Sequence, residues 1–133
     1  MFLLDTSVLI PLRDKDPLIS VQIRELDGPL VMSVISQVEL EGGVHRTPAI
    51  AVARRARLDA MLDAIPVLAL TDAEARIYGQ IVEAAGYSRR KLLDRIIAAQ
   101  ALVVGATLVT LNPDDFGDVE GLAIQELQAT PPG

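Results

Sequence analysis

Five acidic residues stand where chemistry gathers in a parallel α/β sheet. Asp5 directly follows a short apolar N-terminal segment, Glu39 lies shortly after a second one, and Asp94 opens an apolar run. Asp114 and Asp115 follow the buried segment that comes next. Carboxylates brought together without matching cations repel one another. A hard divalent cation such as Mg²⁺ or Mn²⁺ neutralises them, activates water and stabilises charge on a phosphodiester, so the sequence predicts a metal-dependent phosphodiester-cleaving site.

Each acid also has an ordinary structural interpretation. Asp5 suits the N-cap of the helix after it, and Glu39 lies three residues after Ser36, as in a capping box. Asp94 suits the positive end of its helix dipole, and the last two acids suit a turn. Any one position leaves these alternatives open, so the prediction depends on the combination. Because the chain has no cysteine and only His45, which we place on the surface, it offers no zinc set.

The elements that position these acids are predicted to alternate between strand and helix. The expected strands are residues 1–4, 30–32, 66–70, 106–111 and 122–127. The expected helices are residues 6–10 (stopped by Pro11), 18–26, 36–42, 49–64, 72–85 and 94–104. This alternation is typical of a parallel sheet covered on both faces. We therefore predict a single domain over residues 1–133, a three-layer α/β/α fold whose parallel sheet has about five strands.

Composition limits the class of protein. The chain has 133 residues, half of them hydrophobic, and a formal charge of −6. Non-specific nucleic-acid binding depends on positive charge, so any such role needs a local basic patch. The absence of cysteine is typical of a reducing compartment, the N-terminus lacks the basic region of a signal peptide, and the apolar run from Ile96 to Leu111 is too short to cross a membrane. We expect a cytoplasmic protein with no membrane association.

Four segments together resemble known motifs. They are Leu3–Ser7 (LLDTS), Ser33–Gly42 (SVISQVELEG), Asp94–Ala99 (DRIIAA) and Thr110–Phe116 (TLNPDDF). Their types and order resemble those of PIN-domain ribonucleases, and their spacing is similar to that of the VapC-type toxins of toxin–antitoxin pairs. The resemblance runs from Met1 to about Leu127, which is nearly the whole chain.

The resemblance implies a site and an activity. It implies that four acids hold Mg²⁺ or Mn²⁺ for the cleavage of tRNA, rRNA or mRNA, which blocks translation: Asp5, Glu39, Asp94 and Asp115. Further residues match the polar residues that surround such sites in the family and would orient water or phosphate: Thr6, Ser7, Thr110 and Asn112. Asp114 could share the site or substitute for its neighbour. For Thr6 and Thr110, capping and turn bonds are equally open interpretations.

One position departs from the family pattern. Many relatives carry Arg between the Thr and the Asn of the last motif, and here the residue is Leu111. If that Arg helps to hold RNA, other cations must replace it. The candidates cluster around Asp94, where they could contact RNA phosphates or simply form a solvated loop: Arg89, Arg90, Lys91 and Arg95. Arg95 is nearest to Asp94 in sequence, but it could instead pair with a neighbouring acid.

The resemblance also implies partners. It implies inhibition by a VapB-type antitoxin, a homodimer and a hetero-oligomer with the antitoxin. An apolar groove along residues 18–26 and 49–64 could receive the antitoxin, although core packing explains the same residues. An aspartyl-phosphate phosphatase or a receiver domain fits poorly, because position 7 is Ser and no Lys ends the last strand. A non-catalytic PIN-like binding module stays open as the alternative.

Overall fold

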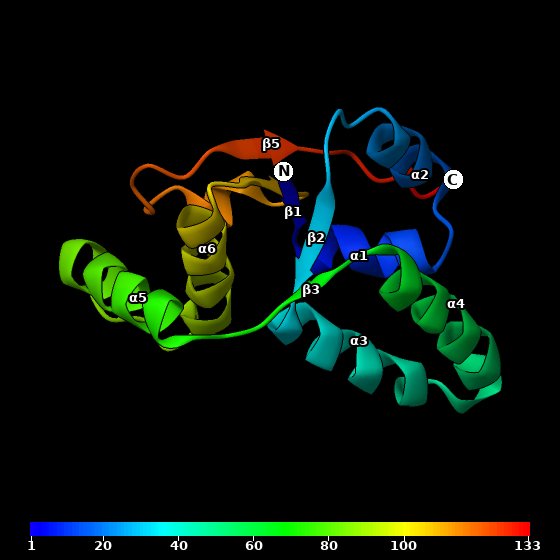
Figure 1. Ribbon diagram of the computed structural model, residues 1–133. Helices are drawn as coiled ribbons and strands as arrows, with labels where there is room; N and C mark the ends of the chain where they lie inside the picture. The colour runs from blue at the N-terminus through cyan, green and yellow to red at the C-terminus, as the bar shows by residue number, and fades with distance from the viewer.

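A five-stranded parallel sheet forms the centre of the computed structural model, which describes all of residues 1–133 (Figure 1). Its strands lie in the order β3-β2-β1-β4-β5. Their bounds are β1 Phe2–Leu4, β2 Leu30–Ser33, β3 Val67–Leu68, β4 Thr107–Thr110 and β5 Ile124–Glu126. Every neighbouring pair is parallel. The predicted five-stranded parallel sheet is therefore confirmed.

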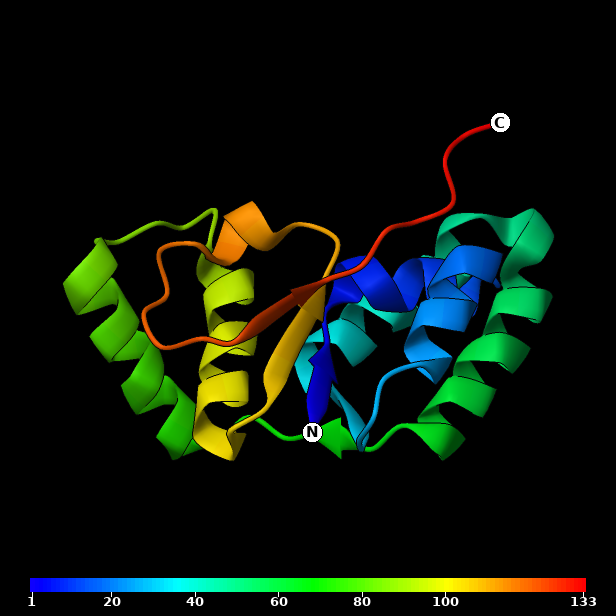
Figure 2. The same ribbon diagram turned by 90° about the horizontal axis from the view of Figure 1, so that it is seen from above.

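Helices cover both faces of the sheet (Figures 1 and 2). They are α1 Thr6–Arg13, α2 Pro17–Arg24, α3 Val34–Arg46, α4 Ala51–Ala64, α5 Asp72–Ala85 and α6 Leu92–Val104, with short 3₁₀ turns at Pro48–Ile50 and Pro113–Phe116. Figure 2 shows α5 and α6 on one side of the strands and the first four helices on the other. The three-layer prediction is confirmed.

Strand residues contribute to two separate hydrophobic cores, because successive side chains of a strand point to opposite faces of the sheet. Leu4 and Val109 belong to the core that contains residues of α1 to α4. Their neighbours Leu3 and Leu108 belong to the core that contains residues of α5 and α6. All four are fully buried, which explains why these strands read as continuous apolar runs.

Two helices differ from the prediction. Helix α1 continues through Pro11 to Arg13, because a proline removes only one backbone donor and later bonds close the last turn. Helix α3 begins at Val34 rather than Ser36, and it runs through Gly42 and Gly43 to Arg46. Its N-cap is Ser33, whose hydroxyl accepts the Ile35 N–H at 2.9 Å. The predicted capping box between Ser36 and Glu39 is wrong, and that leaves the glutamate available elsewhere.

The C-terminal segment is tied to α2. Gln22 and Gln128 exchange two hydrogen bonds, of 2.7 and 3.1 Å. The Thr130 hydroxyl donates to Asp16 at 2.7 Å, so the segment is held to the protein as far as Thr130. No helix combines the length and apolarity that crossing a bilayer requires.

Candidate active site

The ends of three adjacent strands meet at one edge of the sheet. Leu4 pairs in register with Met32 of β2 and with Val109 of β4, so the segments after these strands leave the sheet side by side. The first residues of α1, α3 and α6 lie around the same edge. They surround a cavity of about 600 Å³. Its lining is Asp5, Thr6, Ser7, Ile10, Glu39, Arg89, Arg90, Leu92, Leu93, Asp94, Asn112 and Asp115. The four predicted acids thus line one cavity.

Asp5 is held in place by two hydroxyl groups. It is only 5% exposed, and its Oδ2 accepts hydrogen bonds from Ser7 Oγ at 2.7 Å and from Thr110 Oγ1 at 2.9 Å. The Thr110 hydroxyl also accepts the Asn112 backbone N–H at 3.0 Å. The side chain of Asp5 makes no capping bond to α1, although the residue occupies the N-cap position. These contacts orient the carboxylate towards the cavity instead.

Glu39 is oriented from α1. Its Oε1 accepts a hydrogen bond from Thr6 Oγ1 at 3.1 Å, and that hydroxyl lies 2.7 Å from Ser36 Oγ. Partial burial and the negative charge of Asp5 raise the pKa of Glu39, while the Thr6 hydroxyl acts in the opposite direction. Thr6 and Ser36 therefore form a buried polar bridge that positions this acid.

Asp94 lies in the first turn of α6 and makes no hydrogen bond or ion pair with another side chain. Partial burial, followed by the charges of Asp5, Asp115 and Glu39, raises the pKa of Asp94 to about 6, against a weaker opposing effect of Arg90. This pKa shift is evidence that the four acids share one field. A carboxylate without a partner in such a field is the kind of group that a cation would stabilise.

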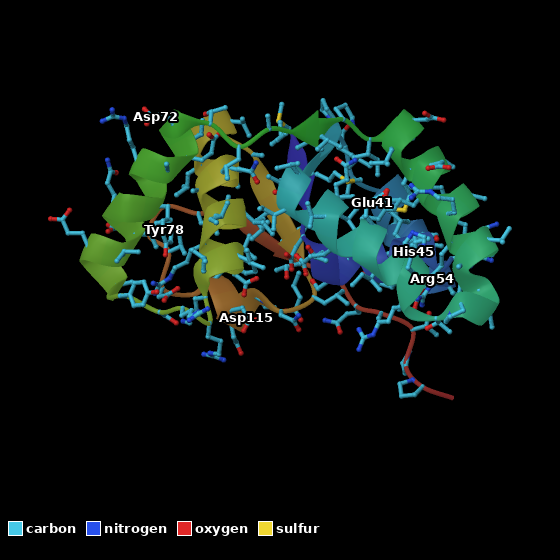
Figure 3. All side chains as sticks on the ribbon, turned by 90° about the horizontal axis from the view of Figure 1, so that it is seen from below. Glu41, His45, Arg54, Asp72, Tyr78 and Asp115 are labelled. Atoms are coloured by element: carbon cyan, nitrogen blue, oxygen red, sulfur yellow. The ribbon has the colours of Figure 1, made fainter.

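The turn after β4 separates the two neighbouring aspartates. Asp115 and Asn112 line the cavity, whereas Asp114 is exposed and stays outside it. Figure 3 shows Asp115 beside α6, while His45 and Arg54 lie on the opposite half of the molecule, over α3 and α4. The side chain of His45 is exposed, as predicted. Nothing in the arrangement gives Asp114 a share in the site.

The donor set suits Mg²⁺ or Mn²⁺ by its chemistry. The cavity offers carboxylate, hydroxyl and amide oxygens, and neither sulfur nor imidazole. In the arrangement described here, no three acidic or histidine side chains are grouped closely enough to form a ready metal site. Like charges that lack a counter-ion favour such separation. The suitability of the cavity for Mg²⁺ or Mn²⁺ therefore depends on the chemical identity of its donor atoms and on Asp94, which has no partner.

The predicted basic patch divides into two parts. Arg89 and Arg90 line the cavity and are exposed, as RNA contacts would require. Arg95 is 2% exposed, donates to the Gly86 carbonyl at 2.6 Å and pairs with Asp118 at 2.8 Å. The prediction that Arg95 contacts RNA is wrong, because the side chain points into the protein.

Lys91 also forms an ion pair with Asp118, at 3.0 Å, and this contact engages its ammonium group. The two cations lower the pKa of Asp118 to about 2, chiefly through the hydrogen bond from Arg95. Sequence reasoning missed Asp118, because no pattern in an exposed acidic turn shows which cation an aspartate will pair with. Its role is to anchor the start of α6, the helix that carries Asp94.

Comparison with known proteins gives the same family. A family model described as "PIN domain" matches residues 2–122. No curated protein sequence matches.

Among solved structures, VapBC2 from Rickettsia felis, bound to a promoter DNA fragment, matches with a TM-score of 0.82 and 22% identity, over 96% of this chain and 98% of that one. VapBC-1 from nontypeable Haemophilus influenzae matches with a TM-score of 0.75 and 25% identity, over 94% and 96%. VapBC-5 from Mycobacterium tuberculosis, from a toxin–antitoxin system, matches with a TM-score of 0.69 and 26% identity, over 95% and 96%. The fold, the family match and these likenesses agree, and the chain belongs to the PIN domain family, within which it resembles the toxins of VapBC systems.

Proposed function

We propose that this protein is a divalent-metal-dependent endoribonuclease, the toxin of a VapBC-type pair, which inhibits translation by cleaving tRNA, rRNA or mRNA. The observation that carries the proposal is the convergence of four carboxylates on one cavity at the carboxyl ends of the strands. Membership of the PIN domain family supports nuclease chemistry. The likeness to VapBC proteins supports the toxin role.

The side chains of the cavity would divide the work. Asp5, Glu39, Asp94 and Asp115 would hold Mg²⁺ or Mn²⁺. When bound, such an ion supplies Lewis-acid stabilisation of the charge that develops on the phosphodiester. Around these ligands, several polar side chains hold the carboxylates in position or present further oxygen and nitrogen atoms to the phosphate: Thr6, Ser7, Thr110 and Asn112.

Arg89 and Arg90 would bind RNA phosphates next to the acids. Both side chains are exposed at the cavity, and neither forms an ion pair with an acid of the protein. Positive charge at this point would offset the repulsion between an RNA backbone and four carboxylates. These two residues would supply the positive charge that many relatives obtain from an Arg at the position of Leu111.

A VapB-type antitoxin is the expected protein partner, in a hetero-oligomer built on a toxin homodimer. The solved relatives named above are VapBC systems, and that supports the partnership. A groove of about 390 Å³ lies between the end of α1, the start of β2 and α4, and its apolar lining includes Leu12, Met61 and Ile65. Helix α4 contributes as expected, whereas no residue of α2 lines this groove. Such a surface suits the apolar face of an antitoxin helix.

Titration with Mn²⁺ tests the metal site without needing the natural RNA. The wild-type protein is expected to bind Mn²⁺ in isothermal titration calorimetry, and Asp94→Asn is expected to lose most of that affinity. Asp114→Asn removes an equal charge one residue from Asp115 but outside the cavity, so it should bind like the wild type. Equal binding by all three proteins would remove the site assignment.

A non-catalytic PIN-like binding module is the second candidate. It is favoured by the observation that no three acids are grouped as a ready metal site. The raised pKa of Asp94, caused first by partial burial and then by the charges of the neighbouring acids, argues against it, because a binding module has no need for that cost. The same titration separates the two, since a module without a site should show no specific Mn²⁺ binding.

A further inference from the structure

A second cavity, of about 510 Å³, lies next to the acidic one. The two share Ile10 and Glu39 as lining residues, so they are neighbours on one face of the protein. The rest of the second cavity comes from the end of α1, the end of α3 and the start of α4. We call it the arginine pocket, and its lining is Ile10, Arg13, Glu39, Gly42, Gly43, Arg46, Thr47 and Arg54.

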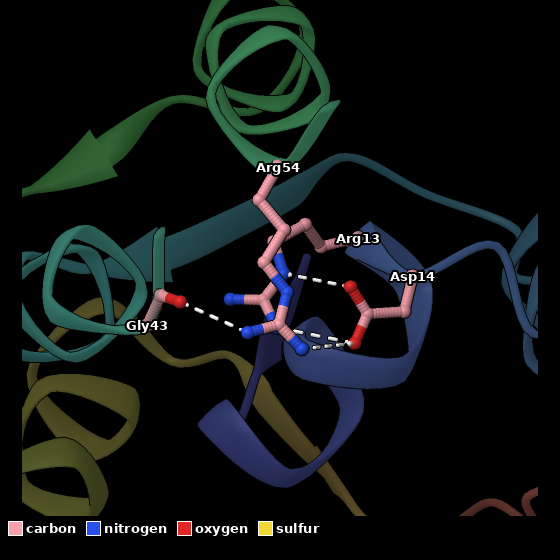
Figure 4. Close-up of polar contacts among 4 residues, drawn as sticks. All are labelled: Arg13, Asp14, Gly43 and Arg54. Carbon is pink, nitrogen blue, oxygen red and sulfur yellow. Dashed lines mark hydrogen bonds and ion pairs between the residues drawn. The ribbon is translucent and has the colours of Figure 1, made fainter. Parts of the chain in front are cut away.

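Arg13 forms the base of the arginine pocket. The residue is 3% exposed, and its Nε and Nη2 donate to the two carboxylate oxygens of Asp14 at 3.0 and 3.1 Å (Figure 4). Its remaining nitrogen, Nη1, has no hydrogen-bond acceptor in the protein. The absence of a side chain on Gly43 leaves room for this nitrogen, because a Cβ there would lie 2.8 Å from Nη1. A buried cation with a free donor thus faces the cavity.

Arg54 reaches the same place from α4. Its Nη1 donates to the Gly43 carbonyl at 2.9 Å, and its Nη2 lies 3.4 Å from Asp14 Oδ2 (Figure 4). Its Nε is buried and has no acceptor. Arg46, in the last turn of α3, is exposed and forms no ion pair. Arg13 and Arg54 therefore share one carboxylate, Asp14, and Arg46 has no ion-pair partner. Even with Glu39 in its lining, the pocket has an excess of positive charge.

We propose that the arginine pocket binds a backbone phosphate of the RNA strand, next to the phosphate that is cut. This inference rests on the proposed function. Guanidinium groups suit phosphate because their N–H donors match its oxygens. The pocket contains free donors from Arg13 and Arg46, and the hydroxyl of Thr47 adds another polar group. One RNA phosphate would satisfy these groups together.

The position of the pocket favours RNA over a protein partner. Arg89 and Arg90 stand on the α6 side of the acidic cavity, and the arginine pocket stands on its α3 side. A single strand that crosses the acids would therefore meet cations before and after the cleaved bond. Since the whole chain carries −6, binding of a polyanion needs such local groups. Two flanking basic groups would also fix the register of the strand across the acids.

Two of the three arginines also have a structural role. Arg13 and Arg54 tie α1 to α3 and α4 through Asp14 and Gly43, so their replacement would test stability together with binding. Arg46 makes no hydrogen bond or ion pair with a side chain, and its removal should leave the fold unchanged. It is therefore the residue to substitute.

Steady-state cleavage of a short single-stranded RNA in Mn²⁺ tests the proposal. Arg46→Ala should raise KM about fivefold to tenfold and leave kcat nearly unchanged, because a phosphate contact away from the cleaved bond binds substrate and transition state alike. Arg46→Glu should raise KM further, and Arg46→Lys should restore most of the binding. The slope of log Kd against log salt concentration should become shallower by about 0.7 in Arg46→Ala. Arg24→Ala, at an exposed arginine in the last turn of α2, is the matched control and should change neither value.

Three other results would each contradict the proposal, and they can be told apart. If the wild type cleaves RNA and Arg46→Glu has the same KM and salt slope, the arginine pocket does not bind RNA and the proposed function survives. If Arg46→Glu weakens only the binding of the antitoxin, the pocket belongs to a protein interface. If the wild type neither binds nor cleaves RNA, the proposed function and this inference fail together.

Discussion

Thr110 Oγ1 donates a hydrogen bond of 2.9 Å to Asp5 Oδ2, which links the ends of β4 and β1 across 105 residues of sequence. Thr110 is fully buried and Asp5 nearly so. The bond fixes the direction of a carboxylate that the proposed activity needs. It also satisfies a polar group in the interior, where an unsatisfied acceptor is costly.

Removing this hydroxyl should therefore reduce both stability and activity. Thr110→Val keeps the shape of the side chain but leaves Asp5 with Ser7 as its only hydroxyl donor. We expect a loss of about 1–2 kcal/mol in the free energy of unfolding and about a 10- to 100-fold loss of metal affinity or cleavage rate. Urea denaturation and Mn²⁺ titration measure the two effects. Thr107→Val on the same strand is the control, since its side chain makes no hydrogen bond, and equal effects of both variants would contradict the role given to Thr110.

The charge of Asp94 should destabilise the metal-free protein. Its pKa is raised to about 6 in the folded state from 3.8, so the folded protein favours the protonated form and loses stability as pH rises from about 4 through 6. Asp94→Asn should therefore stabilise the metal-free protein at pH 7.5 by about 1 kcal/mol, after allowance for solvent screening of a partly exposed group. That corresponds to a rise in Tm of roughly 3–5 °C.

Thermal unfolding in EDTA at two pH values checks this expectation. The gain from Asp94→Asn should be present at pH 7.5 and should nearly vanish at pH 4, where the native carboxyl is already protonated. Asp114→Asn, outside the cavity, should show no such pH-dependent gain. If Asp94→Asn lowers Tm at pH 7.5, the acids do not repel one another as described.

Metal binding should weaken at acidic pH. Protons compete with the cation for the same carboxylates. The pKa of about 6 for Asp94 moves that competition up from near pH 4 to near pH 6, and the pKa of Glu39 is shifted in the same direction. The affinity for Mn²⁺ should rise steeply between pH 5 and pH 7 and then level off. Calorimetric titration at several pH values measures it. An affinity that is flat over this range would mean that Asp94 is not a ligand.

Two adjacent glycines in the interior of α3 should respond in opposite ways to alanine. Glycine costs a helix about 1 kcal/mol relative to alanine. A Cβ at Gly42 would meet no atom within 4 Å, so Gly42→Ala should stabilise the protein by up to about 1 kcal/mol. A Cβ at Gly43 would lie 2.8 Å from Arg13 Nη1, so Gly43→Ala should destabilise it by displacing a buried ion pair. Urea denaturation of both variants tests this, and stabilisation by Gly43→Ala would contradict the packing described for Arg13.

Part of the site could be predicted because the strands are parallel, and the resemblance to PIN-domain ribonucleases indicated which acids form it. Parallel strands bring their carboxyl ends together, and that places Asp5 beside the turn that carries Asp115. The strands could be located because each contains a short apolar run. The sheet and its layers follow from the same pattern.

Other features depend on contacts that one-dimensional patterns do not contain. The start of α3 lies two residues earlier than predicted because Ser33, rather than Ser36, accepts the capping bond. Arg95 neighbours Asp94 in sequence, but the turn of the helix points its side chain into the protein towards Asp118. The arginine pocket joins Arg13 to Arg54 across 41 residues, and no spacing in the chain indicates that contact.

The cleavage of RNA by the purified protein is the direct test of whether the four carboxylates form a metal-dependent nuclease site. Total RNA would be incubated with the wild type, Asp5→Asn, Asp94→Asn and Asp114→Asn, each in Mn²⁺ and in EDTA. We expect discrete cuts by the wild type and by Asp114→Asn in Mn²⁺, and none in EDTA or with either of the other two variants. Cuts that persist in Asp5→Asn and Asp94→Asn, or in EDTA, would contradict this expectation, because the activity would then not come from the four carboxylates at the end of the sheet.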